Sequence, residues 1–292
     1  MLLSCFVFRW RLKTTFKPSF KKIALATLVS GLVLSGALAY GLYRLVEREF
    51  PDVAVLNSKY PIVSEQGPKL PPKIRLVNTP PPGWVRIGEI PKPAMGAIVV
   101  SEDWAFFSHD GFDANQLKEA IKEDLADRRF SRGASTITMQ VVKNVFLSQE
   151  KTLYRKAKEF VLAIRLDQHV SKRKVLEVYF NIAEWGEGIF GIGPAAAHYF
   201  GKTPSELTPK EGAFLAMLLP SPKRYSQSFR DGRLTPYASK TIRSILMKMA
   251  QAQYITEEER DAELAKPLSF EKEGTPETPL ELDLSESDGE NT

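Results

Sequence analysis

The sequence contains a single cysteine, Cys5, among its 292 residues. One thiol cannot form an internal disulfide, and it cannot build a cysteine-based zinc site. Histidine is also scarce, and the three histidines show no metal-binding spacing. No internal repeat is present, which excludes solenoid and propeller architectures. With 43% apolar residues, the chain can form one core of up to about 200 residues plus accessory segments. We therefore expect one main domain.

Charge is missing from Ile23 to Tyr43, a run that consists almost entirely of apolar and small residues. At about 1.5 Å per residue, a helix of this length spans roughly the 30 Å hydrocarbon core of a membrane. Six cations precede the run, and the positive-inside rule then places the N-terminus in the cytoplasm and the chain after residue 44 outside. A cleaved signal peptide is the alternative, because Ala37–Ala39 resembles a cleavage site. We favour an anchor, since the run continues past that point.

Composition divides the rest of the chain. Residues 1–22 form a basic cytoplasmic segment before the anchor at 23–43, and residues 44–93 are rich in proline, which indicates a stalk with one or two edge strands. Residues 94–270 show helical patterns. Residues 271–292 are acidic and poor in apolar side chains, so we expect a disordered tail. The net charge of +5 suits an anionic membrane, a phosphorylated substrate or nucleic acid, but nucleic acid conflicts with an external domain.

Capping signals and apolar periodicity make the predicted domain mainly α-helical. Asp113 is a candidate N-cap, and residues 203–206 and 208–211 each combine a cap, a first-turn proline and the glutamate of a capping box. The second box opens an apolar segment, 212–219, that we expect to be a buried helix.

Two adjacent acids, Glu102 and Asp103, end an apolar run and precede three aromatic residues. A carboxylate in such a partly dehydrated place has a raised pKa and suits a general base. The competing interpretation is that both acids only cap a helix or form salt bridges. Farther on, a small-residue turn leads to Ser135 at an expected helix start, which suits an anionic oxygen, although Ser135 equally fits a simple N-cap.

A helix is expected from Lys151 to His169, with Lys151, Arg155 and Glu159 four residues apart on one face. We expect the other face to pack inward through its apolar residues, Leu153, Ala157, Phe160, Val161 and Ile164. The charged face then either lines a cleft or is a solvated face stabilised by ion pairs.

Taken in order, four segments resemble the signature blocks of glycosyltransferase family 51, the peptidoglycan glycosyltransferases. They are residues 102–111, 133–140, 155–159 and 174–181. The likeness runs from about residue 94 to 225 and continues more weakly to about 265. Met139 departs from the glutamine that many members carry, so we assign it no substrate contact. With one anchor and no transpeptidase domain, the chain resembles the monofunctional biosynthetic transglycosylase branch.

The resemblance implies a mainly α, lysozyme-like domain behind a single N-terminal transmembrane helix. It implies polymerisation of lipid II into β-1,4 glycan strands, with inversion and release of undecaprenyl pyrophosphate. Glu102 would be the general base and Glu159 a second catalytic carboxylate. The expected substrate-binding residues are Ser135 and Gln140 at the donor site and Lys143, Lys151 and Arg155 at the phosphates.

The same resemblance implies a catalytic domain in the periplasm, tethered to the inner membrane. No cofactor or metal site is expected in the protein itself, while Mg²⁺ or Mn²⁺ is a candidate companion of the substrate pyrophosphate. Candidate partners are lipid II, the growing glycan chain, and cell-division or penicillin-binding proteins. Contact with lipid and burial in the core are equal alternatives for a group of aromatic and basic residues, Phe106, Phe107, Phe112, Phe130, Arg128 and Arg129. A lysozyme-like hydrolase and a non-catalytic membrane-anchored scaffold are the rival functions.

Overall fold

The structure is a computed structural model, and it describes residues 20–64, 66–67, 72–112, 118, 135–148, 150 and 152–272. The chain divides into two compact units, Met1–Pro51 and Asp52–Thr292. The predicted tail beyond residue 272, most of the basic segment 1–22 and the candidate cap Asp113 lie outside the described residues.

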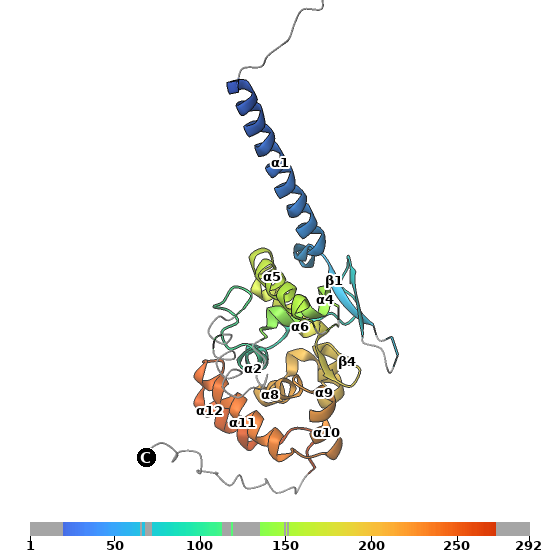
Figure 1. The fold of residues 1–292 in the computed structure, drawn as a ribbon. Helices are drawn as coiled ribbons and strands as arrows, with labels where there is room; N and C mark the ends of the chain where they lie inside the picture. Colours follow the sequence, from blue (N-terminus) through green and yellow to red (C-terminus); the bar gives the residue numbers. More distant parts are fainter. Residues whose placement is uncertain are drawn as a thin grey trace, which may run out of the picture. The chain divides into compact units, whose positions relative to one another are not determined.

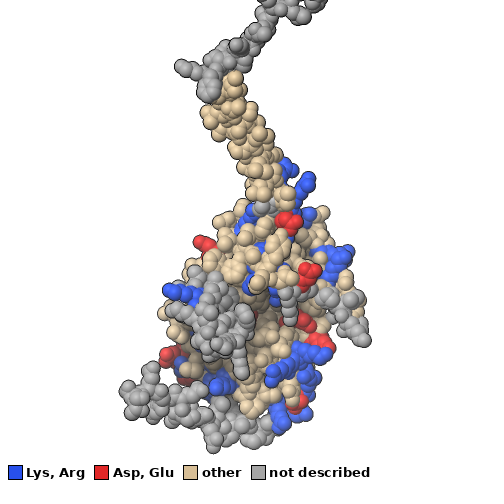
Figure 2. Space-filling model, in the orientation of Figure 1, with Lys and Arg blue, Asp and Glu red and all other residues tan. Residues whose placement is uncertain are grey.

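The first unit contains one long helix, α1, from Phe20 to Glu49. This helix is long and apolar enough to cross a membrane. Figure 2 shows uncharged side chains along most of its length, with charged side chains toward its C-terminal end. The predicted anchor, residues 23–43, therefore lies within a longer helix, because nothing in the sequence stops helix propagation before Pro51.

The second unit begins with short elements: the 3₁₀ turn η1 (Val53–Asn57), strands β1 (Tyr60–Ser64) and β2 (Lys73–Val77), and the 3₁₀ turn η2 (Ile87–Glu89). The two strands pair antiparallel, with Tyr60 opposite Val77. These are the edge strands expected within the proline-rich region.

The structure groups residues 52–93 with the domain, where the sequence predicted a stalk. Leu56 is fully buried, and the Asn57 side chain donates a hydrogen bond to the carbonyl of His169 at 2.9 Å. The amide of Val85 donates to Asn181 Oδ1 at 2.9 Å. Proline has no backbone N–H donor, so this stretch has few hydrogen bonds of its own to offer. Side chains of distant helices accept hydrogen bonds from some of its backbone amides, and residues 52–93 therefore pack without long strands or helices.

The rest of the domain, as far as the structure describes it, is helical apart from a short hairpin, so the predicted mainly α class is confirmed (Figure 1). Its first helices are α2 (Lys92–Glu102), α4 (Ile137–Phe146), α5 (Leu153–His169) and α6 (Lys172–Ile182). The hairpin, α7 and η3 follow, as β3 (Glu184–Gly186), β4 (Ile189–Phe190), α7 (Ile192–Phe200) and η3 (Pro204–Glu206). The last helices are α8 (Pro209–Leu218), α9 (Pro222–Tyr225), α10 (Gln227–Asp231), α11 (Pro236–Gln251) and α12 (Glu257–Ala265).

Two groups of helices share the core. Helix α4 packs on α5 and α6, and α2 packs on α8 and α11. Both predicted capping boxes are present, and every residue of α8 after its first is buried, as expected for an apolar helix. The α2–α8 approach is very close, because a Cβ placed on Gly212 would lie 2.7 Å from the Cα of Ala94. This packing fixes α2, which carries Glu102 at its C-terminal end.

Candidate active site

Glu102 is the last residue of α2, and its carboxylate lies against α4. Gln140 Nε2 donates a hydrogen bond to Glu102 Oε2 at 2.9 Å. The hydroxyl of Tyr179, on α6, donates to Gln140 Oε1 at 3.3 Å. Three helices distant in sequence thus meet at one carboxylate.

Burial raises the pKa of Glu102 above its ordinary value of 4.5. The hydrogen bond from Gln140 opposes this rise, while the negative charge of Asp103 adds to it. Burial also raises the pKa of Tyr179 well above 10.0, so its hydroxyl stays protonated. A carboxylate with increased proton affinity, held by a neutral amide, is suited to accept a proton from a hydroxyl group.

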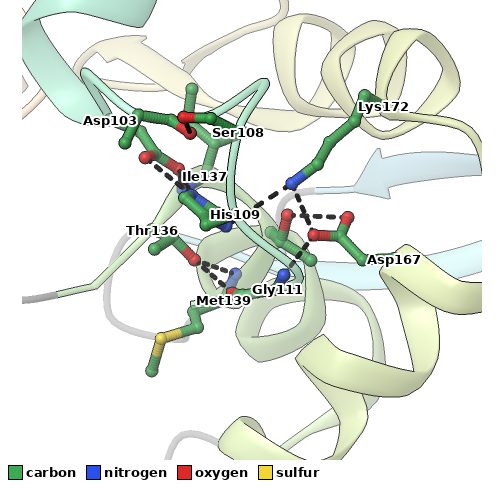
Figure 3. Close-up of polar contacts among 11 residues, drawn as sticks. Asp103, Ser108, His109, Gly111, Thr136, Ile137, Met139, Asp167 and Lys172 are labelled. Atoms are coloured by element: carbon green, nitrogen blue, oxygen red, sulfur yellow. Dashed lines mark hydrogen bonds and ion pairs between the residues drawn. The ribbon is translucent and has the colours of Figure 1, made fainter. Parts of the chain in front are cut away.

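Asp103, the second acid of the pair, has a different role from Glu102. It caps the C-terminus of α2, is 1% exposed, and accepts a hydrogen bond from the amide of Ile137 at 2.9 Å. His109 Nε2 lies 2.9 and 3.1 Å from its two oxygens. Figure 3 shows this contact at the start of α4. The capping interpretation therefore holds for Asp103, which also forms a hydrogen bond with His109, whereas Glu102 has a raised pKa.

Glu159 is the centre of a second cluster. It is 1% exposed, and its oxygens pair with Arg155 Nη1 at 2.8 Å and with Lys156 Nζ at 2.6 Å. Lys156 Nζ also donates to the hydroxyl of Ser135 at 2.9 Å. The N-cap of α4 is Thr136, not Ser135. Two cations therefore flank Glu159 and compensate its negative charge.

One short stretch of chain joins the two clusters. Ser135 accepts a hydrogen bond from Lys156, one of the two cations that pair with Glu159, and Gln140 donates one to Glu102. Five predicted site residues therefore lie in these two clusters. Glu102 contacts Gln140 at one end of residues 135–140, and Arg155 and Glu159 belong to the cluster at the other end, next to Ser135.

Two predicted lysines are not part of these contacts. Lys143 is exposed on α4, three residues after Gln140 and so on the same helical side. Lys151 lies outside the described residues.

The predicted inward face of α5 was wrong. Leu153 is 90% exposed and Val161 is 40% exposed, while the buried residues of α5 are Glu159, Leu162, Ala163 and Leu166. The face of α5 that packs inward therefore differs from the predicted face and includes Glu159. The ion pairs with Arg155 and Lys156 offset the energetic cost of burying the Glu159 carboxylate. A prediction based only on the positions of apolar residues does not place a glutamate on the inward face.

Of the aromatic residues that were candidates for contact with lipid, some lie in the core and others at the surface. Phe106 is fully buried, and Phe107 is 52% exposed. The rings of Phe112 and Phe160 pack edge to face, 5.6 Å apart. Phe130, Arg128 and Arg129 lie outside the described residues.

Sequence reasoning missed Lys156, Asp167 and Lys172, which all make contacts around these clusters. Lys156 could have been found as the neighbour of Arg155 that lies three residues before Glu159. The blocks also contain residues with structural contacts. Glu177 accepts hydrogen bonds from Trp84 Nε1 at 3.1 Å and from the amide of Ile87 at 3.2 Å.

A comparison with protein families matches residues 75–250 to the family described as "Transglycosylase". A "Biosynthetic peptidoglycan transglycosylase" of Nitrosomonas eutropha is 40% identical over 169 residues, which cover 58% of this chain and 68% of that protein. A protein of the same name from Azoarcus sp. is 42% identical over 158 residues, or 54% of this chain and 67% of that protein. One from Nitrosospira multiformis is 39% identical over 169 residues, covering 58% and 72%.

The family match and the similar proteins define the class of this chain as an enzyme that transfers sugar residues, a glycosyltransferase. The chain belongs to the transglycosylase family. It is a peptidoglycan transglycosylase, a glycosyltransferase that builds glycan strands.

Proposed function

We propose that the chain polymerises lipid II into β-1,4 glycan strands, with Glu102 as the general base. The observation that carries the proposal is the half-buried Glu102, whose carboxylate has a raised pKa and accepts a hydrogen bond from Gln140. Ser135, five residues before Gln140, joins the same stretch to Lys156, one of the two cations that pair with Glu159. A base and a cationic site on one stretch match the two needs of this reaction.

In the proposed step, Glu102 takes the proton from the 4-hydroxyl of the acceptor sugar. The oxygen attacks the anomeric carbon of the growing chain, and the new glycosidic bond forms as the carbon–oxygen bond to the pyrophosphate breaks. Attack opposite the leaving group inverts the configuration. The bonding electrons pass to the departing undecaprenyl pyrophosphate, which needs charge neutralisation rather than a proton.

The leaving pyrophosphate would contact the cationic residues, with Arg155 as the principal ligand. Arg155 Nη1 pairs with Glu159, but its buried Nε has no hydrogen-bond partner among the residues that the structure describes. A guanidinium group carries five N–H donors, so it can bind phosphate oxygens while it holds Glu159. Lys143 and Lys151 complete the proposed phosphate ligands. We assign Glu159 the task of holding Arg155 and Lys156 rather than of moving a proton.

A divalent ion would have to bring most of its ligands with the substrate. Among the described residues, no group of three or more His, Cys, Asp or Glu side chains could hold a metal. Both oxygens of Glu159 already pair with cations. We therefore propose that Mg²⁺ or Mn²⁺, where present, is bound by the substrate pyrophosphate and water.

We further propose that α1 anchors the protein in the inner membrane, with the N-terminus in the cytoplasm and the domain in the periplasm. The charge-free run and the cations before it support this orientation. The anchor would keep the site beside the bilayer that carries both lipid-linked substrates. Cell-division and penicillin-binding proteins remain candidate partners of the domain.

Incubation of the detergent-solubilised full chain with labelled lipid II tests the proposal. We expect wild type to form polymer, and Glu102→Gln to be slower by about 10²–10⁴-fold, the usual contribution of a general base. Glu187→Gln is the matched control, because the Glu187 side chain is 69% exposed. Wild-type protein that leaves lipid II unchanged and instead cleaves finished peptidoglycan would contradict the proposal.

A further inference from the structure

Two buried carboxylates hold the first turn of α4 from different elements. Asp103 accepts a hydrogen bond from the amide of Ile137 at 2.9 Å, and Asp167 accepts one from the Thr138 hydroxyl at 3.2 Å. The Asp103 side chain is 0% exposed and that of Asp167 is 2% exposed. Gln140, which donates to Glu102, follows Thr138 by two residues on the same helix. The position of this turn therefore sets the position of the Gln140 amide.

Lys172 and His109 connect the two carboxylates (Figure 3). Lys172 Nζ donates to Asp167 Oδ2 at 2.5 Å and to His109 Nδ1 at 3.5 Å. Because an ammonium group only donates, Nδ1 is the acceptor, and the histidine proton lies on Nε2, which donates to Asp103. The lysine also lies 4.6 Å from the centre of the Phe106 ring. The chain of contacts thus runs without a break from α5 and α6 to the residue next to Glu102.

Gly111 joins the turn after α2 to Asp167 and to the N-cap of α4, Thr136. Its amide donates to Asp167 Oδ2, and its carbonyl accepts a hydrogen bond from the Thr136 hydroxyl at 2.7 Å. Its φ of +84° and the backbone of Ala163, which a Cβ would approach to 2.6 Å, leave no room for a side chain. Asp167 therefore holds both the turn and α4 at once.

We propose that Lys172 and Asp167 are positioning residues for glycosyl transfer. They hold residues 103–111 and the first turn of α4 in the arrangement in which Gln140 donates to Glu102. Neither residue contacts Glu102 in the structure, so they act through Asp103, His109 and Thr138. The inference rests on the proposed role of Glu102 as the base. Misplacement of a catalytic group by about 1 Å costs roughly 10²-fold in rate, which sets the expected size of the effect.

Lys174, on the same helix, provides a matched control. Its Nζ pairs with Glu177 at 2.8 Å, and it lies 4.3 Å from the centre of the Tyr60 ring. Its side chain is 17% exposed, against 21% for Lys172. Both lysines thus make one ion pair and lie over aromatic rings at similar burial, Lys172 over Phe106 and Lys174 over Tyr60 and Trp84. Lys174 contacts the β1 region instead of the carboxylates around α4, so its loss should disturb packing without moving the base.

The test compares Lys172→Met with Lys174→Met in the full chain, assayed with lipid II in detergent. We expect both variants to lower the melting temperature by a similar amount. Only Lys172→Met should lower kcat, by about 100-fold, with little change in KM. Lys172→Arg, which keeps the positive charge, should recover most of the lost kcat. Asp167→Asn, which keeps an oxygen for Thr138 but removes the charge opposite Lys172, should also lower kcat.

Equal kcat values for Lys172→Met and Lys174→Met would overturn the inference, as would a loss confined to KM or failure of Lys172→Arg to recover activity. These outcomes are distinct from failure of the proposed function. That failure would appear as wild-type protein inactive on lipid II, or as full activity in Glu102→Gln. An active wild type and an inactive Glu102→Gln, together with a normal kcat in Lys172→Met, would reject the positioning role alone.

Discussion

Gln140 donates a 2.9 Å hydrogen bond to Glu102 across 38 residues of sequence. The other end of its amide accepts from Tyr179, whose raised pKa keeps the hydroxyl protonated. This contact fixes the amide with its nitrogen toward Glu102. Gln140 therefore stabilises the charged form of Glu102, in opposition to the effect of burial.

The pH dependence of the reaction should follow from this opposition. A base acts only when deprotonated, so kcat/KM should rise with pH, with its midpoint above 4.5 because the Glu102 pKa is raised. Gln140→Met removes the hydrogen bond that lowers the pKa, and the midpoint should then move to still higher pH. Initial rates with lipid II between pH 4 and about 9 measure both midpoints.

Met139→Leu is the control for the pH experiment. Met139 is fully buried next to Gln140, and its side chain offers no strong hydrogen bond. Its replacement should leave the midpoint in place. A midpoint that falls in Gln140→Met would show that the amide does not stabilise the carboxylate.

Glu102→Gln should stabilise the folded protein at neutral pH while it removes activity. The folded-state pKa of Glu102 lies above its unfolded value, so burial of the charge costs nothing well below 4.5. The cost grows as pH rises through the folded pKa, and it is complete above it. A neutral amide escapes this cost. We expect the melting temperature to rise at pH 8 and to change little at pH 4.

Thermal unfolding of both proteins across this pH range measures the difference. A melting temperature for Glu102→Gln below that of wild type at pH 8 would argue that the charge is stabilising where it lies.

Glu159→Gln should weaken both folding and catalysis. The substitution removes the negative charge that holds Arg155 and Lys156 at 2.8 and 2.6 Å. We expect a loss of about 2 kcal/mol in the free energy of unfolding, the size of a hydrogen bond to a charged group. Activity should fall by roughly 10²-fold, because the cations then lose their position at the pyrophosphate. Denaturant unfolding and lipid II assays measure the two effects.

Glu211→Gln separates these effects. The Glu211 side chain is 5% exposed and pairs with Lys202 at 2.7 Å, at the start of α8. It should cost comparable stability and leave activity unchanged at a temperature where the variant is folded. If Glu159→Gln lost only stability, as this control does, Glu159 would have no part in binding substrate.

Gly111→Ala should destabilise the protein by about 3 kcal/mol or more, through both its positive φ and the contact with Ala163. Gly201→Ala is the control for φ alone. Gly201 ends α7 with a φ of +66° and has open space where a Cβ would lie, so we expect it to cost about 1 kcal/mol. Chemical denaturation of the two variants measures the difference, and equal losses would show that the 103–111 turn relaxes around the methyl group.

Local patterns in the sequence predicted much of this structure. The charge-free run indicated the apolar helix α1, and the capping boxes at Thr203 and Thr208 are present. These signals act between neighbouring residues, so a linear sequence contains them in full. The predictions for residues 44–93 and for the face of α5 were less successful, because both depend on contacts with distant parts of the chain.

The sequence by itself determined the mainly helical class, the capping boxes at Thr203 and Thr208, and the residue types that can accept a proton or bind a phosphate. Only the tertiary structure decided that Asp103 caps α2 while Glu102 has the raised pKa, and that Glu159 forms ion pairs with two cations. The reason is physical: burial and hydrogen bonding set the proton affinity of a carboxylate, and both arise from residues that lie far apart along the chain.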